Sequence, residues 1–310
     1  MAQADKAKVF IDGEAGTTGL QIRDRLAGEN SVEVISIDHA LRKDDTERKE
    51  MMREADVIIL CLPDDAARDA VALADSLGGE APKIIDASTA HRTAEGWVYG
   101  FAELFNGQAD RIAAAAKVAN PGCYPTGAIA LLRPLIDARI MPADFAVTVN
   151  AVSGYSGGGK AMIAAYEKSE APAFELYGLS LHHKHVPELQ LYSGLTKRPI
   201  FVPSVGNFAQ GMLVSIPLHL ESLPSAPNPA DIEAAYRAHY ADPASGVRVG
   251  EGSAMNGRIE PQALNGTDEM ELFVFADQAF GQAVLVARLD NLGKGAAGAA
   301  VQNLKLMIGL

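Results

Sequence analysis

Cys123 is the residue whose type and setting most clearly predict chemistry in this sequence. It stands in the run Asn120-Pro121-Gly122-Cys123-Tyr124-Pro125-Thr126-Gly127, between an apolar strand-like segment, 111–119, and a helix-like segment, 128–136. The turn puts the cysteine at the start of that helix, where unpaired backbone N–H groups and the positive end of the helix dipole favour a thiolate. A thiolate is a nucleophile towards acyl groups. The alternative is that Cys123 is a small buried hydrophobic residue.

A histidine-rich run, 182–188, follows further along the chain and ends in Pro187 and Glu188. A thiol enzyme needs a proton donor and acceptor that works near neutral pH, and histidine is the usual one. We therefore predict that His183 is the catalytic acid/base, with His185 as the alternative. The run could also be a solvated polar loop. A zinc site formed by these residues is disfavoured, because no second ligand cluster exists and Pro187 interrupts helical spacing, so no metal is expected.

A glycine-rich loop follows the first apolar segment, in the pattern Gly13-x-x-Gly16-Thr17-Thr18-Gly19. Its position between a strand and a helix predicts a dinucleotide site, in which the helix N-terminus meets the pyrophosphate. The pattern is not the standard GxGxxG, so its place in the chain carries the prediction. Asp38, expected at the end of the second strand, would suit the ribose of NAD, whereas Arg42 and Lys43 would suit the 2′-phosphate of NADP.

The segment 154–161 imitates a phosphate-binding P-loop, but Ala161 replaces the hydroxyl residue that binds magnesium. Because the pattern is so similar to a P-loop, a nucleotide-dependent phosphotransferase is the alternative prediction from a different class of protein. The glycines could still surround a substrate anion, with Ser153 and Lys160 as contacts.

Composition narrows the class of protein. The chain has 310 residues, enough for about two domains, and a net charge of −12, which argues against nucleic-acid or anionic-membrane partners. Cys61 and Cys123 form no CxxC pair or disulfide framework, which fits a reducing compartment. The polar segment Met1–Lys8 is no signal peptide and no apolar stretch reaches membrane-spanning length, so we expect a cytoplasmic protein.

The order of expected elements predicts the fold class. Strands at 8–12, 33–38, 56–62 and 83–86 alternate with helices in the first part, which indicates a Rossmann-like α/β domain with a parallel sheet. Later strands, at 145–152, 212–220, 247–251, 269–276 and 282–289, favour an α+β domain with a mostly antiparallel sheet. We expect a dinucleotide-binding domain from residues 1–121 with 292–310, and a catalytic domain from residues 122–291.

Five runs in this order resemble the N-acetyl-gamma-glutamyl-phosphate reductases of arginine biosynthesis, in their shorter form: 13–19, 120–127, 152–160, 183–188 and 290–298. The family is related to the aspartate-semialdehyde dehydrogenases. The resemblance implies NADPH as cofactor, a homodimer or homotetramer, and a C-terminal helix that returns to the first domain. It also suggests cofactor contacts from Ser88, Asn291 and Gly293, and substrate contacts from Arg92 and Asn120 as well as His185 and Glu188.

The implied reaction is reduction of an acyl phosphate through a thioester on Cys123. N-acetyl-glutamyl 5-phosphate is the substrate that the resemblance favours. Aspartyl phosphate is the alternative, because one methylene is worth only about 1–3 kcal/mol of discrimination and no residue here indicates the pocket.

Overall fold

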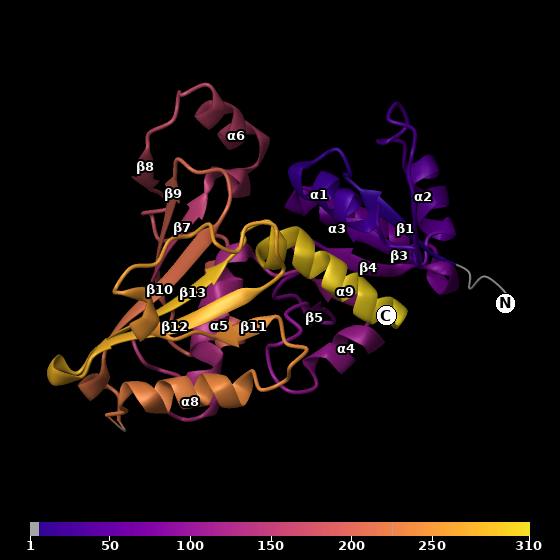
Figure 1. Ribbon diagram of the computed structural model, residues 1–310. Coiled ribbons are helices and arrows are strands. Elements are labelled where there is room, and N and C mark those ends of the chain that lie inside the picture. The colour runs from indigo at the N-terminus through magenta and orange to yellow at the C-terminus, as the bar shows by residue number, and fades with distance from the viewer. Residues whose placement is uncertain (1–5, 225) are drawn as a thin grey trace. The chain divides into compact units, whose positions relative to one another are not determined.

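The computed structural model describes residues 6–224 and 226–310, which form two compact units (Figure 1). The first unit holds the chain up to Ala102, Gly107–Pro121 and Ala296–Leu310. The second holds Glu103–Asn106 and Gly122–Gly295. The division predicted from the sequence puts segments 103–106 and 292–295 in the first domain, whereas the structure groups them with the second unit. Most of the polar N-terminal segment Met1–Lys8 lies outside the described residues.

Within the described residues, the first unit is built on a six-stranded sheet in the order β2-β1-β3-β4-β6-β5, in which all neighbouring strands are parallel. Its strands are β1 Ala7–Asp12, β2 Val32–Ile35, β3 Val57–Leu60, β4 Lys83–Asp86, β5 Val98–Tyr99 and β6 Lys117–Ala119. Its helices are α1 Thr17–Leu26, α2 Asp45–Glu54, α3 Asp64–Asp75, α4 Gln108–Ala114 and α9 Gly298–Ile308.

Helices cover both faces of this sheet. One apolar core joins Val9 and Ile11 of β1 to residues of α1, α4 and α9, and the other joins Phe10 of the same strand to residues of α2 and α3. Successive side chains of a strand point to opposite faces, so a sheet covered on both sides needs continuous apolar strands. β3 meets this requirement, since all four of its residues are buried.

Among the described residues, the second unit is built on a seven-stranded mixed sheet in the order β11-β12-β13-β10-β7-β9-β8. Its strands are β7 Thr148–Gly154, β8 Phe174–Leu176, β9 Ile200–Gly206, β10 Met212–His219, β11 Val247–Val249, β12 Met270–Asp277 and β13 Gln282–Leu289. Its helices are α5 Cys123–Asp137, α6 Gly159–Glu167, α7 Val186–Ser193 and α8 Pro229–His239. The β7–β9 and β11–β12 pairs are parallel, and the others are antiparallel.

The central helix α5 carries Cys123 and packs against the sheet. Eleven of its fifteen residues are buried, and a Cβ atom on Gly127 would lie 2.8 Å from the Val214 side chain of β10. Glycine at this position therefore lets the helix approach the sheet closely and fixes the place of its N-terminus.

Two expected elements differ from the structure. The segment 111–119 is not a strand throughout, because α4 ends at Ala114 and only Lys117–Ala119 is extended. The alanine run at 113–116 favours helix, which the apolar pattern alone did not reveal. The second strand ends at Ile35, so Asp38 lies beyond it rather than at its end.

The predicted fold class is confirmed: the chain contains a Rossmann-like α/β unit and an α+β unit, and the C-terminal helix α9 belongs to the first. α9 supplies Ala300, Leu304 and Met307 to the first unit's core. Among the described residues, no helix is long and apolar enough to span a membrane.

Candidate active site

Cys123 is the first residue of α5, as the sequence predicted. Gly122 precedes it as the N-cap residue, with φ −76° and ψ 147°, and its carbonyl accepts a hydrogen bond from the Thr126 hydroxyl at 2.8 Å. A Cβ atom on Gly295 would lie 2.9 Å from the Cβ of Cys123, so the segment before α9 borders the cysteine within the second unit. The thiol therefore lies at the positive end of a fifteen-residue helix dipole.

Aromatic rings from three parts of the second unit gather around Tyr124, the residue that follows Cys123. The ring of Tyr124, the next residue of α5, lies 6.2 Å from the ring of His183 and 6.0 Å from that of His185. The two histidine rings are 4.8 Å apart, and the ring of Tyr177 lies 5.8 Å from His183. We call these five residues the cysteine–histidine cluster: Cys123, Tyr124, Tyr177, His183 and His185.

Two tyrosine hydroxyls of the cluster form a chain of hydrogen bonds. Tyr177 donates to the Tyr124 oxygen at 3.1 Å, and Tyr124 donates to the Ser204 carbonyl at 2.9 Å. Burial raises the pKa of Tyr177 to about 12, and the negative charge of Cys123 contributes to the rise. Burial also raises the pKa of Tyr124, and the charges of Tyr177 and Cys123 add smaller contributions. Both hydroxyls therefore stay protonated at neutral pH.

His183 is uncharged at neutral pH in this setting. Burial, with a smaller effect of the Lys184 charge, lowers the pKa of His183 to about 4. Its Nδ1 accepts the backbone N–H of His185 at 3.1 Å, so the neutral ring carries its proton on Nε2. In this arrangement His183 offers a hydrogen-bond donor, and proton uptake at Nδ1 requires release of the His185 amide.

Glu188 and Ser153, both expected to contact substrate, are buried in the second unit. Glu188 is 1% exposed, and its carboxylate accepts the N–H of Gly122 at 3.0 Å. The Ser153 hydroxyl donates to the Gly154 carbonyl at 2.9 Å. Lys160, by contrast, is exposed in the first turn of α6. The structure thus brings His183, His185 and Glu188 together with Cys123 in one unit.

The glycine loop of the first unit has the geometry of a nucleotide-binding turn. Gly13 follows β1 with φ +89°, and a Cβ atom there would lie 2.4 Å from the Cys61 carbonyl oxygen. A Cβ atom on Gly19 would lie 2.6 Å from the Gly13 oxygen. In the part of the chain that the structure describes, the N-cap residue of α1 is Gly16, so no side chain caps the N-terminus of this helix. The first turn of α1 also contains no acidic residue. The amides at Thr17 and Thr18 therefore suit a phosphate group.

Of the residues 36–43 that follow β2, Ile37 is half-buried and the others are exposed. Asp38 Oδ1 accepts the Ala40 N–H at 2.8 Å, which closes a local turn. Arg42 bonds to the His39 carbonyl, and Lys43 is exposed. Ser36, the residue directly after β2, donates to the Glu14 carboxylate of the glycine loop at 2.9 Å. Sequence reasoning missed this contact, because it placed the end of β2 at Asp38.

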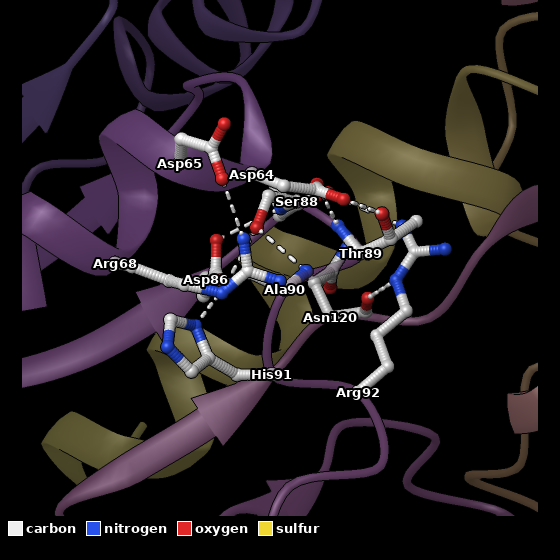
Figure 2. Close-up of polar contacts among 11 residues, drawn as sticks. Asp64, Asp65, Arg68, Asp86, Ser88, Thr89, Ala90, His91, Arg92 and Asn120 are labelled. Atoms are coloured by element: carbon white, nitrogen blue, oxygen red, sulfur yellow. Dashed lines mark hydrogen bonds and ion pairs between the residues drawn. The ribbon is translucent and has the colours of Figure 1, made fainter. Parts of the chain in front are cut away.

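Figure 2 shows the polar contacts that follow β4 in the first unit. The buried Asp86 carboxylate accepts the Ser88 hydroxyl at 2.8 Å and lies 2.6 Å from His91 Nδ1. Arg92, 7% exposed, donates from Nε to the Asn120 carbonyl at 3.0 Å. These contacts restrict the side chains of the loop that follows β4. Ser88 and Arg92 therefore lie in a rigid part of the first unit.

Asn120, Asn291 and Gly293 occupy internal positions. Asn120 Nδ2 donates to the Ala296 carbonyl at 3.0 Å, within the first unit. In the second unit, Asn291 donates to the Ser156 hydroxyl at 3.0 Å and accepts the Gly211 N–H at 2.8 Å. A Cβ atom on Gly293 would lie 1.9 Å from the Thr267 carbonyl oxygen. The side-chain groups of both asparagines therefore have structural partners already.

Cys61 differs chemically from Cys123. Burial raises the pKa of the Cys61 thiol to about 12, and the charges of Asp86 and Asp12 contribute. Cys61 follows β3 directly and packs, partly buried, against one of the two cores of the first unit. At neutral pH, Cys61 is a thiol of low reactivity.

Sequence reasoning missed Tyr177 and the partner role of Tyr124. Tyr124 lies inside the cysteine run, and its position beside the nucleophile could have suggested a role. Tyr177 carries no motif, and only the fold brings it to the cluster. Over the part of the chain that the structure describes, no group of three or more His, Cys, Asp or Glu side chains could hold a metal ion.

The chain is similar to known proteins over nearly its whole length. Residues 123–291 match the family model described as "Semialdehyde dehydrogenase, dimerisation domain". The chain is 56% identical to N-acetyl-gamma-glutamyl-phosphate reductases of Brucella ovis and Brucella canis, over 98% of this chain and 99% of each relative.

Solved structures of similar fold have far lower sequence identity. Aspartate semialdehyde dehydrogenase II from Vibrio cholerae has a TM-score of 0.72 at 15% identity and covers 98% of this chain and 99% of its own. The aspartate semialdehyde dehydrogenase from Candida albicans, solved with NADP, has a TM-score of 0.70 at 16% identity, with 98% and 99% coverage. At these identities the likeness shows the fold alone.

Proposed function

Because the chain belongs to the N-acetyl-gamma-glutamyl-phosphate reductase family, we propose that it reduces N-acetyl-glutamyl 5-phosphate to N-acetyl-glutamate 5-semialdehyde with NADPH, in arginine biosynthesis. The observation that carries the proposal is the placement of Cys123 at the start of α5, with His183 and His185 in the same cluster. The identity to named reductases over nearly the whole chain supports the substrate.

The proposed reaction passes through a covalent intermediate. The Cys123 thiolate attacks the acyl carbon, the C–O bond to phosphate breaks, and a thioester remains. The thioester carbon then accepts a hydride, which NADPH supplies when bound. The resulting thiohemiacetal oxyanion collapses to the aldehyde and regenerates the thiolate. Each turnover consumes one hydride and one proton, and the departing phosphate takes up the proton.

His183 fits a defined part of this reaction. Both tetrahedral intermediates place negative charge on the acyl oxygen, and preorganised donors aimed at such an oxygen are a large source of catalysis. The neutral ring with its proton on Nε2 supplies such a donor. The acid/base role expected from the sequence needs the His185 amide to leave Nδ1, and the phosphate dianion of the substrate would favour that protonated state.

The first unit supports NADPH binding through the glycine loop. The uncapped N-terminus of α1, described above, would receive the pyrophosphate. Arg42 and Lys43 are the exposed cations that would meet a 2′-phosphate, while Asp38 is occupied with a local turn. Ser88, Asn291 and Gly293 remain predicted contacts of the cofactor. The predicted contacts of the substrate remain Asn120, Arg92, Ser153, Lys160, His185 and Glu188.

Phosphate-dependent reduction of NADP by the purified protein tests the proposal in the reverse direction, which avoids the labile acyl phosphate. N-acetyl-glutamate 5-semialdehyde should react, and aspartate semialdehyde should react poorly. Preference for aspartate semialdehyde would keep the chemistry and move the substrate to the aspartyl series. Lack of reaction with either aldehyde, in folded protein supplied with NADP or NAD, would contradict the proposal. ATP hydrolysis without NADPH would instead favour the phosphotransferase.

A second copy of the chain is the proposed partner, through the open face of the seven-stranded sheet. Register and the two-residue period place Leu176, Ile200 and Val284 on one face, where they are 49%, 52% and 39% exposed. Exposed apolar patches mark interaction sites, and the matching family model is named for dimerisation. Light scattering should give a dimer or tetramer, and Ile200→Asp should lower the mass. A monomeric wild-type protein would contradict this.

A further inference from the structure

Glu188 connects the histidine-containing segment to the turn that carries the nucleophile. It lies in the first turn of α7, which follows directly after His183 and His185. Its carboxylate accepts the N–H of Gly122 at 3.0 Å, and Gly122 is the N-cap residue next to Cys123. One side chain thus joins two segments about sixty residues apart in the sequence, on both sides of the proposed reaction centre.

The carboxylate of Glu188 is buried next to the N-terminus of α5. Glu188 is 1% exposed, and a buried carboxylate is costly without strong hydrogen bonds. It also competes with a Cys123 thiolate for the positive end of the α5 dipole, because both are negative. A neutral acceptor would hold the Gly122 amide without this repulsion, so the contact carries both a geometric and an electrostatic consequence for Cys123.

We propose that Glu188 is a positioning residue: its carboxylate fixes the Gly122 amide and thereby sets the orientation of Cys123 against the histidine segment. This inference rests on the proposed role of Cys123 as the nucleophile. It also assigns the Gly122 N–H to Glu188, so the oxyanion must be held by other donors, among them His183. The resemblance implies a substrate contact for Glu188, and the bond to Gly122 adds a positioning role.

Two substitutions separate the geometric effect from the electrostatic one. Glu188→Gln keeps an acceptor oxygen for Gly122 and removes the charge, whereas Glu188→Ala removes both. Glu170→Gln is the control, since it removes an exposed carboxylate elsewhere in the same unit. The other titratable groups near Cys123 are left unchanged in all three variants: Tyr124, Tyr177, His183 and His185.

The pH dependence of Cys123 alkylation by iodoacetamide reports the thiol pKa without substrate or cofactor. Both Glu188 variants should lower that pKa by about one unit, because a nearby negative charge disfavours the thiolate. In steady-state assays, Glu188→Ala should lower kcat about 10- to 100-fold, as expected for a misplaced reacting group, and Glu188→Gln should lose much less. Glu170→Gln should change neither quantity.

An unchanged thiol pKa in Glu188→Gln would overturn the inference, because Cys123 would then not sense this carboxylate. Equal loss of kcat in the two Glu188 variants would also overturn the inference, because the loss would then not depend on an acceptor for the Gly122 N–H. If Glu188→Ala does not fold, the pH profile of Cys123 alkylation in Glu188→Gln still tests the inference. Absence of turnover in the wild-type protein would remove the proposed function, while the alkylation result would still test Glu188.

Discussion

Asn303 of the last helix donates a hydrogen bond from Nδ2 to the side-chain oxygen of Asn120, at 3.0 Å. The same amide group donates to the Gly100 carbonyl at 2.9 Å. Both asparagines are almost completely buried, and Asn120 begins the turn that leads to Cys123. A buried amide of the C-terminal helix therefore holds the approach to the nucleophile in place within the first unit.

Asn303→Ala should lower the free energy of unfolding by about 1–3 kcal/mol, the usual cost of leaving a buried polar partner unsatisfied. Urea denaturation measures this change. Lys305→Ala on the same helix is the matched control, because it breaks only a half-exposed pair with Glu29, and it should cost less than about 1 kcal/mol. Similar losses for both variants would mean that the Asn303 contact contributes no special stability.

The sequence predicted the local features of the site and missed those made by packing. Cys123 begins a helix as expected, because the Asn-Pro-Gly turn and the apolar run after it are local signals. β4 and β13 also have the bounds that their apolar patterns predicted. Each of these features depends on residues that are neighbours in the chain.

Contacts between distant elements could not be predicted in this way. Tyr177 reaches the cluster only because β8 pairs with β9, and Glu188 meets Gly122 only because α7 packs on α5. Asn303 carries no motif that marks it as a partner of Asn120. The error at Asp38 has a different cause, since β2 is short and the polar residues after Ile35 gave no clear strand end.

Iodoacetamide at neutral pH should modify Cys123 and leave Cys61 unmodified in the folded protein. The pKa of the Cys61 thiol is raised to about 12, whereas Cys123 lies at a helix N-terminus, which favours the thiolate. Mass spectrometry of peptides from briefly treated protein measures the two sites, and protein unfolded in urea is the control in which both react. Faster labelling of Cys61 would contradict the assignment of the nucleophile.

Substitution of His183 should show whether it acts as a hydrogen-bond donor. His183→Ala should lower kcat about 10²- to 10³-fold, the cost of one lost oxyanion donor. His183→Asn keeps a side-chain N–H and should lose less. His182→Ala changes an exposed neighbour and is the control. Equal losses in the Ala and Asn variants would favour proton transfer by His183 instead.

His183 should also make stability depend on pH. Its pKa falls from 6.5 to about 4 on folding, so between these values the unfolded chain binds the proton and the folded one does not. The contribution of neutral His183 to the free energy of unfolding is therefore at its full value above about pH 6.5, and it is lost as the pH falls towards 4. Urea denaturation near pH 7.5 and pH 5 should show a smaller loss in His183→Asn than in the wild-type protein. His239, whose pKa burial also lowers, is present in both. Equal losses would mean that the environment of His183 does not disfavour its charge.

Gly19→Ala should weaken NADPH binding about tenfold or more while the protein stays folded. The added methyl group would lie 2.6 Å from the Gly13 oxygen and 2.7 Å from the Glu14 Cα, so the loop must shift away from the N-terminus of α1. Overpacking of this kind typically costs 1–3 kcal/mol, which corresponds to roughly 5- to 150-fold in affinity. Gly28→Ala is the matched control, because its new methyl group would meet no atom within 4 Å. Fluorescence titration with NADPH measures both variants, and circular dichroism checks that they are folded. Unchanged affinity in folded Gly19→Ala would show that this loop does not bind the pyrophosphate.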